Sequence, residues 1–290
     1  MKKALLYNGE VDLIRDDDHQ YWVNGEKKKG VTGTIRNLIA KPGLMPWALE
    51  MGAKYLRSNL KVGDFVTENL VNDLCAGIKT ASNVIRDAAG DVGTAAHGWI
   101  EQWTESRIGY GPEPDMPDSI PVRMAVNGFL NECKYFEFIS SENPVYSLLH
   151  DRCGTMDSII RKEVTDLANA TLAGMYVLPA KKKKTGLLDY KTSSGFYWDQ
   201  ILQALIYAVF HNEELSYCGK TELVEFIQIM RLDKTSGQAF AGPEIEVGPE
   251  ASRIVTSFFY LADRMEEFES LCKGLNPRKQ YNRKKKDWRQ

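Results

Sequence analysis

The chain has 290 residues, of which 43% are hydrophobic and 26% are charged. This length and composition predict a water-soluble globular protein with a full hydrophobic core. The formal net charge is only −2, which excludes a polycation. Any contact with nucleic acid is therefore expected from a local basic patch.

The cysteines and the N-terminus indicate a reducing compartment. Five cysteines are scattered along the chain without a C-x-x-C pair. This pattern favours free thiols and argues against a zinc site or an iron–sulfur cluster. The first apolar stretch breaks at Asn8, too early for a signal peptide, and no apolar run approaches the ~20 residues of a membrane helix. We therefore expect a cytoplasmic protein without a membrane segment.

The N-terminal part is expected to begin with a β-hairpin. Asn24-Gly25 lies between strand-like flanks and predicts a type I′ turn. Helical pieces follow, and breaks in them are predicted at Pro42 and Pro46.

Further helices are predicted up to residue 139. One covers 64–90, and a separate one begins at Thr94, a residue type that caps helix N-termini. A surface loop rich in proline and glycine covers 110–121. Apolar residues at helical spacing then predict a helix over 121–139.

The β-rich half begins near Pro144. Strands are predicted where apolar runs are bounded by turn residues, at 144–150, 155–161, 185–191 and 223–232. The other elements predicted there are a helix near 197–211, an edge hairpin over 237–247 and a last amphipathic helix over 249–273.

These elements predict one α/β domain over 1–275. Its N-terminal hairpin and helices occupy 1–140 and its core occupies 141–275. A basic tail follows over 276–290.

Two opposite charges end the apolar strand at 185–191. Asp189 and Lys191 stand two residues apart, so their side chains share one face of a strand. The carboxylate can bind a hard cation such as Mg²⁺, and the ammonium can position a water molecule. Alone, this D-x-K triplet also fits an exposed strand end.

Other acids and a histidine are candidates to complete such a site. Asp157 begins an apolar strand, where burying an unpaired acid is costly. His97 and Glu101 lie four apart on one helix face, and an imidazole can complete a metal's ligand set. Glu142 precedes the first strand of the β-rich half and is a candidate for a second metal. Each of these residues also fits a role without function, as a strand-end acid, a helix histidine or a loop acid.

Two further groups are candidates for supporting the site or contacting DNA. Gln203 and Tyr207 share one face of the helix that follows the D-x-K strand. Four consecutive lysines form a positive patch that is either a solvated hairpin tip or a phosphate contact; they are Lys181, Lys182, Lys183 and Lys184.

In their order along the chain, these motifs resemble the PD-(D/E)XK nucleases, in particular the RecB-like branch that includes lambda-type phage exonucleases. That branch shows a helix histidine, an acid before the first core strand, then G-x-x-D, D/E-x-K and Q-x-x-x-Y. The matching residues are His97, Glu142, Gly154 to Asp157, Asp189 to Lys191, and Gln203 to Tyr207. The resemblance covers about residues 20–212.

The resemblance implies a mixed central β-sheet flanked by helices, with a restriction-endonuclease-like core. It also implies a Mg²⁺- or Mn²⁺-dependent nuclease that acts on DNA, without an iron–sulfur cluster. A single-strand annealing protein and further copies of the chain are candidate partners by analogy alone.

The resemblance also assigns roles to residues. His97, Asp157, Asp189 and the Tyr190 carbonyl would bind metal, and Lys191 would orient or activate the water. The Q-x-x-x-Y pair would support Lys191 or touch the DNA backbone. The segment between Asp157 and Asp189 is longer than in many members, which leaves the pairing of those strands open.

Three functions stay open at this point. The first is a phage or prophage exonuclease, used in DNA recombination or processing in the cytosol of a bacterial host. The second is an endonuclease on the same fold, and the third is a non-catalytic DNA-binding protein. The intact charges of all the motifs disfavour the third.

One further motif resembles a phosphate-binding loop. The "CGKT" at 218–221 matches the end of such a loop, but the glycine required five residues before Gly219 is replaced by Glu214. No ATP site is therefore expected.

Overall fold

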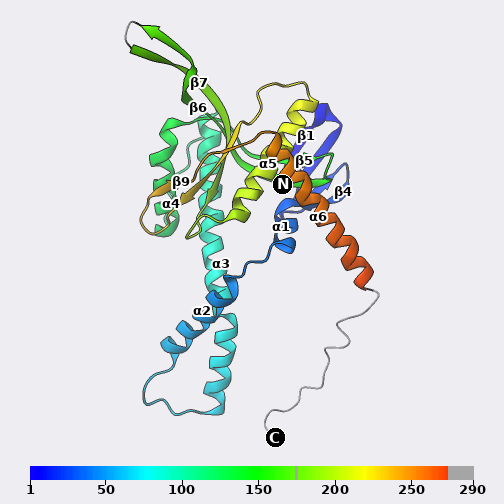
Figure 1. Cartoon of the computed structure of the whole chain (residues 1–290). Coiled ribbons are helices and arrows are strands. Elements are labelled where there is room, and N and C mark those ends of the chain that lie inside the picture. Colours follow the sequence, from blue (N-terminus) through cyan, green and yellow to red (C-terminus); the bar gives the residue numbers. More distant parts are fainter. Residues whose placement is uncertain (174–175, 274–290) are drawn as a thin grey trace.

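The computed structural model describes residues 1–173 and 176–273. In that part of the chain the protein is α/β, with a mixed central sheet flanked by helices (Figure 1). None of the described helices has a stretch long and apolar enough to cross a lipid bilayer.

The strands form one ten-stranded sheet. They are β1 (Lys2–Leu6), β2 (Val11–Arg15), β3 (Tyr21–Val23), β4 (Glu26–Gly30), β5 (Glu137–Ser147), β6 (Arg152–Ala173), β7 (Tyr176–Lys191), β8 (Phe226–Leu232), β9 (Ala239–Ala241) and β10 (Ile245–Glu246). Their order is β1-β2-β3-β4-β6-β7-β8-β10, and β5 and β9 pair in addition with β6 and β8. The sheet is mixed because β4–β6 and β7–β8 are parallel, whereas the other pairs are antiparallel.

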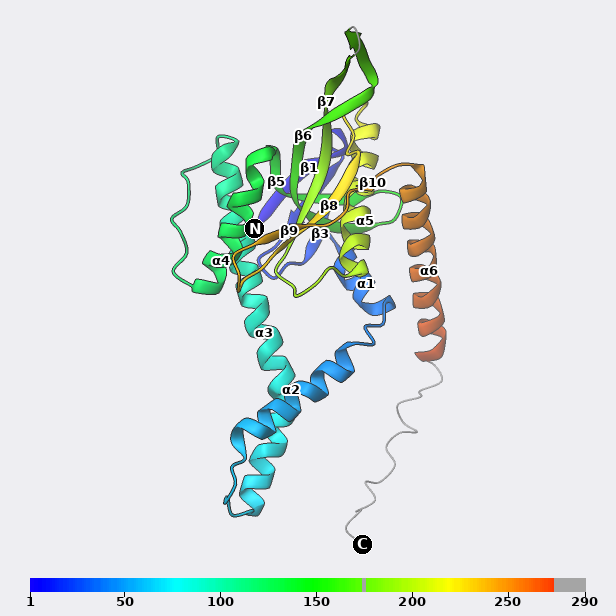
Figure 2. The same cartoon turned by 60° about the vertical axis from the view of Figure 1, so that its left-hand side comes forward.

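Helices cover both faces of this sheet. They are α1 (Val31–Leu38), α2 (Leu44–Asn59), α3 (Glu68–Arg107), α4 (Ile120–Glu132), α5 (Trp198–Tyr217) and α6 (Pro249–Lys273), with two short 3₁₀ turns, η1 (Tyr7–Gly9) and η2 (Cys133–Tyr135). Successive strand side chains point to opposite faces. Ile160 and Leu188 accordingly pack in a cluster with α3 and α4, whereas Ile159 and Leu187 pack with α5 and α6. Figure 2 shows α3 and α4 on one side of the sheet and α5 and α6 on the other.

The hairpin predicted at Asn24-Gly25 is confirmed. β3 and β4 pair antiparallel across it, and both turn residues have positive φ, +50° and +83°, as a type I′ turn requires. The sequence analysis did not predict β1 and β2, which extend this hairpin into a four-stranded meander. The break predicted at Pro46 is wrong, because this proline lies in the first turn of α2, where the backbone N–H that proline lacks has no helical partner.

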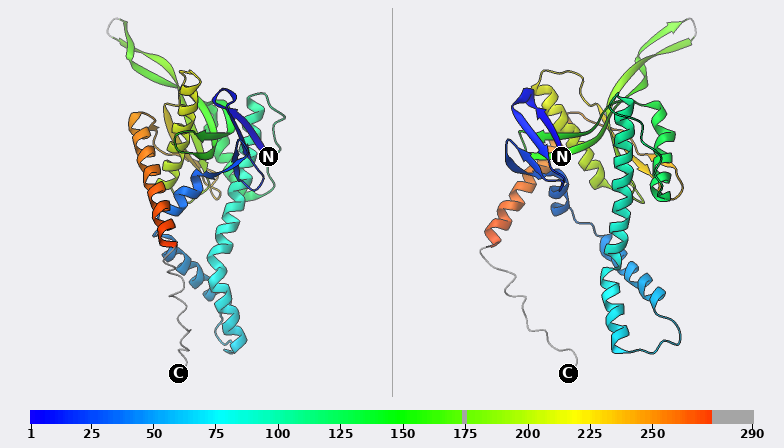
Figure 3. Two further views of the ribbon diagram at one scale, coloured as in Figure 1. Left: turned by 90° about the vertical axis from the view of Figure 1, so that its right-hand side faces the viewer. Right: turned by 180° about the vertical axis from the view of Figure 1, so that it is seen from behind.

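The break predicted before Thr94 is also wrong. α3 is continuous over 40 residues, and its N-cap is Thr67, whose side chain accepts a hydrogen bond from the Leu70 N–H. Gly93 lies inside α3 and allows a close approach: a Cβ at this position would lie 3.0 Å from Thr192 Oγ1. Outside the body of the molecule, α3 pairs with α2 to form a projecting helical arm (Figures 1 and 3).

The β-rich half follows the predicted order with three differences. The helix predicted over 121–139 is too long, because α4 ends at Glu132 and residues 137–139 begin β5. β9 and β10 do not form the predicted hairpin, since each pairs with β8 instead. The segment between Asp157 and Asp189 is a long antiparallel ribbon of β6 and β7, which projects from the sheet. The predicted tail at 276–290 lies outside the described residues.

Candidate metal-dependent catalytic site

Three acids lie in one row across adjacent strands. In the antiparallel pair of β6 and β7, Ser158 lies opposite Leu188. The next residues along, Asp157 and Asp189, therefore lie beside each other. The β5–β6 register pairs Ser141 with Ser158 and Asn143 with Met156, which places Glu142 on the other side of Asp157. Residues directly opposite each other on antiparallel strands share one face of a sheet. The strands of Asp157 and Asp189 are therefore direct neighbours, despite the long segment between them.

Asp157 is held by a backbone group and by α3. The Tyr190 N–H donates to Asp157 Oδ2 at 2.7 Å, and His97 Nδ1 lies 3.5 Å from Asp157 Oδ1. Burial alone would raise the pKa of Asp157, but His97 and the backbone bond outweigh it and the pKa is lowered. Burial would likewise lower the pKa of His97, yet the charge of Asp157 raises it. The imidazole and the carboxylate therefore attract each other strongly.

Asp189 is the most deeply buried acid of the row, with only 2% of its surface exposed. Lys191 Nζ lies 2.6 Å from Asp189 Oδ2, and the two groups form a close, largely buried ion pair. Burial raises the pKa of Asp189 to about 6 in spite of the attraction of Lys191. The cation that this buried carboxylate oxygen meets in the structure is the Lys191 ammonium.

Glu142 sits in an uncommon backbone conformation. Its φ is +48°, in the left-handed region that few residues other than glycine adopt. Burial raises the pKa of Glu142, and the charge of Asp157 raises it further. Two cations face its carboxylate: Arg15 Nη1 at 3.4 Å and Lys2 Nζ at 3.7 Å from Oε2.

The donor atoms of this cluster fit a divalent metal ion. Ligand atoms of His97, Glu142 and Asp157 all lie within 4.8 Å of one another. Carboxylate oxygens are the ligands that Mg²⁺ and Mn²⁺ prefer, and a cation would offset the repulsion between the buried acids. Asp189 is not in this group, because its carboxylate reaches Lys191. The Tyr190 carbonyl stays a predicted ligand.

The Gln203/Tyr207 pair contacts Thr32 of α1, and Tyr207 also packs against the strand of Asp157. Gln203 Nε2 donates to Thr32 Oγ1 at 2.7 Å, and the Tyr207 hydroxyl lies 3.3 Å from the same oxygen. Tyr207 is buried, and a Cβ at Gly154 would lie 2.1 Å from its ring. The glycine of G-x-x-D therefore makes room for the tyrosine of Q-x-x-x-Y.

Glu101 lies one helical turn after His97 but forms an ion pair with Lys2. Since Lys2 also faces Glu142, Glu101 positions a cation near the acids rather than adding a ligand. Lys2 and Arg15 were not candidates in the sequence analysis, because β1 and β2 were not predicted. Thr32 was missed as well, and nothing in the local sequence marks it as a partner of a helix about 170 positions away.

The four lysines lie far from the acids along β7. At ~3.3 Å per residue, Lys184 is about 17 Å and Lys181 about 26 Å from Asp189. Lys181 pairs with Glu163 at 3.0 Å, and Lys183 with Glu137 at 2.6 Å. Lys182 and Lys184 form no ion pair among the described side chains. The structure therefore does not bring the lysine patch to the acids.

No protein-family model matches the chain, and no curated protein matches it. The functional argument therefore rests on the geometry and chemistry of the site.

Proposed function

We propose that this protein is a Mg²⁺- or Mn²⁺-dependent DNA nuclease of the RecB-like branch of the PD-(D/E)XK superfamily. The observation that carries the proposal is the placement of Asp157 beside Asp189 on adjacent strands, with Lys191 against the buried Asp189 carboxylate. The order of the motifs and the mixed sheet flanked by helices are what the resemblance implies. Of the two, the sheet architecture supports the proposal independently of the acids.

The chemistry of each residue suggests its part in hydrolysis. His97, Glu142 and Asp157 would hold the cation, with Asp189 beside them. When bound, such a cation polarises a phosphoryl oxygen and lowers the pKa of a water. Lys191 would position the attacking water or stabilise the charge that develops on the phosphate.

We propose the exonuclease form of this activity first, of the phage or prophage type used in DNA recombination or processing. Lambda-type exonucleases are the members that the motifs resemble. An endonuclease with the same core would use the same chemistry, but it would also accept DNA without ends.

Digestion of linear and covalently closed circular DNA tests the proposal. We expect the linear duplex to be degraded in Mg²⁺ or Mn²⁺, the circle to persist, and excess EDTA to stop the reaction. Asp157→Asn, prepared in the same way, controls for contaminating nucleases. A circle that is cut would assign the endonuclease form. No cleavage of either substrate, or full activity in EDTA, would overturn the nuclease or its metal dependence respectively.

A further inference from the structure

Three consecutive aromatic residues follow the D-x-K strand and lie partly in solvent. Phe196, Tyr197 and Trp198 are 43%, 47% and 59% exposed. Phe196 and Tyr197 end the connection that follows β7, and Trp198 is the first residue of α5. Exposed aromatic surface of this size is not needed for the core.

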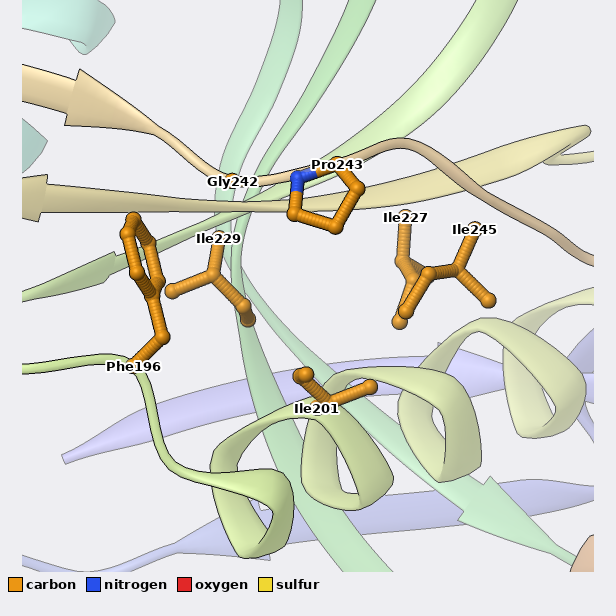
Figure 4. A pocket seen from close by; sticks show the side chains of 7 residues that line it. All are labelled: Phe196, Ile201, Ile227, Ile229, Gly242, Pro243 and Ile245. Atoms are coloured by element: carbon orange, nitrogen blue, oxygen red, sulfur yellow. The ribbon is translucent and has the colours of Figure 1, made fainter.

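Phe196 anchors this segment to the body of the protein. Its ring lines a small apolar pocket with Ile201, Ile229 and Pro243 (Figure 4). It also packs against the backbone of Gly242, where a Cβ would lie 3.2 Å from the ring. Tyr197 and Trp198 do not line this pocket and belong to none of the described core clusters.

Hydrogen bonds brace the same segment. The Ser193 hydroxyl donates to the Gly195 carbonyl at 2.8 Å and accepts from Gln200 Nε2 at 3.2 Å. The Tyr197 N–H donates to Gln200 Oε1 at 3.3 Å, and its hydroxyl lies 3.2 Å from Ser194 Oγ. The Tyr197 side chain is therefore held in place, and Trp198 follows it directly as the first residue of α5. A braced segment loses little conformational freedom when a ligand binds it.

The segment begins beside the candidate site. Thr192 follows Lys191 directly and lies against Gly93 of α3. Gly93 and His97 are four residues apart on α3, hence on one helix face and about 6 Å apart along its axis. The aromatic residues thus follow the end of β7, which carries Lys191, and this strand end lies against the face of α3 that carries His97.

Aromatic rings held at a nuclease site are suited to unpaired nucleobases. A base stacks on an aromatic side chain with little regard to its identity. A base inside a duplex is stacked on both faces, so only an unpaired base or a frayed end can use the rings. We propose that Tyr197 and Trp198 form a stacking platform for unpaired bases of the strand that enters the site. This inference rests on the proposed function and deepens it, because it names a single-stranded or frayed DNA end as the substrate.

A binding experiment with normal and abasic DNA tests the platform. Affinity is measured in Ca²⁺ for an oligothymidylate of about 12 nucleotides, a length that spans common single-strand sites, and for an abasic strand of equal length. The variants are Trp198→Leu, which removes the ring, and Trp198→Phe, which keeps one. Tyr110→Leu, at a 71% exposed position after α3, is the matched control.

We expect Trp198→Leu to weaken oligothymidylate binding at least about fivefold, the lower end of measured stacking contributions. Trp198→Phe should lose less, and Tyr110→Leu should bind as wild type. The abasic strand should bind wild type more weakly and be insensitive to Trp198→Leu, which separates stacking from a general structural effect.

The outcomes distinguish this inference from the proposed function. Equal binding of oligothymidylate by wild type and Trp198→Leu, or an equal loss on the abasic strand, would overturn the platform while leaving nuclease activity intact. A change of oligomeric mass with unchanged DNA affinity would overturn it too, and would assign the rings to a protein interface. Absence of both DNA binding and cleavage in wild type would overturn the proposed function and the platform together.

Discussion

The buried charge of Asp189 belongs to the candidate site and lowers the stability of the fold. Burial raises the pKa of its carboxyl group from 3.8 to about 6, so the folded state binds this proton more tightly than the unfolded chain does. The corresponding stabilisation is present below about pH 4 and is lost as the pH rises through about 6. At neutral pH the ionised carboxylate therefore costs stability even beside the Lys191 ammonium, unless a further cation binds it.

We expect Asp189→Asn to stabilise the protein in chelator at pH 8. Asparagine keeps the shape of the protonated acid without its charge. The free energy of unfolding should rise by up to about 3 kcal/mol, from 1.36 kcal/mol per pKa unit over about two units. Near pH 4 the difference should vanish. Urea unfolding at both pH values measures this, with the surface variant Asp118→Asn as control. A variant less stable than wild type at pH 8 would contradict the cost assigned to this charge.

Gly154 and Tyr207 should be coupled sterically. Gly154→Ala places a methyl group 2.1 Å from the ring, which should destabilise the protein by about 1–3 kcal/mol. Combined with Tyr207→Leu, the same alanine should cost much less, because the ring is gone. Chemical denaturation of the two single variants and the double variant gives the coupling free energy. Strictly additive costs would show that the tyrosine does not require the glycine.

The sequence predicted the residues of the site better than their partners. Asp189 and Lys191 could be found because a strand has a period of two, and His97 because its helix is periodic. Thr32, Lys2 and Arg15 could not, since each acts through a contact more than 90 positions away. Such contacts depend on sheet register, which no local pattern of a single sequence reveals.

Among the elements, the β6–β7 ribbon differs most from its prediction. One of the two readings of its four lysines places them at a hairpin tip, yet Lys181 to Lys184 lie on regular strand β7. Alternation along the strand places Lys181 and Lys183 on one face, where both meet glutamates, and Lys182 and Lys184 on the other. Only the second pair has charge that is not already matched among the described side chains.

If the ribbon contacts DNA, its two faces should differ in salt dependence. Replacing both Lys182 and Lys184 with Gln should reduce the steepness of the log–log salt dependence of binding by about 0.7–0.9 for each DNA phosphate that these lysines neutralise. Replacing Lys181 and Lys183 should change it less, because their charges are partly neutralised by Glu163 and Glu137. Titrations at several salt concentrations in Ca²⁺ compare the two double variants. Unchanged binding in both would make the ribbon a solvated projection.

The helix end predicted before Thr94 was wrong because local sequence does not decide where α3 ends. Two glycines at 90 and 93 precede Thr94, a pattern that favours a helix end. The helix continues because its later residues Ala96, Trp99, Ile100 and Trp103 are buried against the sheet, and this burial outweighs the roughly 1 kcal/mol cost of each glycine. Tertiary packing here overrides local preference.

On the scale of the whole molecule, four elements meet at one point. α3 supplies His97, β5 supplies Glu142, β6 supplies Asp157 and β7 supplies the pair Asp189 and Lys191. The alternation of strands and helices was enough to predict an α/β fold, whereas the mixed sheet was predicted only from the family resemblance. The strands β1 and β2, the projecting arm of α2 and α3, and the projecting ribbon of β6 and β7 were not predicted. Short strands and a long ribbon carry weak periodic signals.

The most direct test of the central claim is the cleavage rate of Lys191→Ala in Mg²⁺, together with its DNA affinity in Ca²⁺. This variant keeps all the acids and loses the group that would act on the attacking water. Because Lys191 faces a buried carboxylate, Lys191→Met, which keeps the aliphatic stem, is measured beside it, and Lys54→Ala, at an exposed position of α2, is the control. Thermal unfolding identifies the variants that are folded.

We expect the folded Lys191 variants to bind DNA nearly as wild type and to cleave it at least about a hundredfold more slowly, the lower end of typical acid–base contributions. Lys54→Ala should cleave at the wild-type rate. Near-normal turnover by a folded Lys191 variant would contradict the account, because Lys191 would then be a structural partner of Asp189 and not a catalytic group.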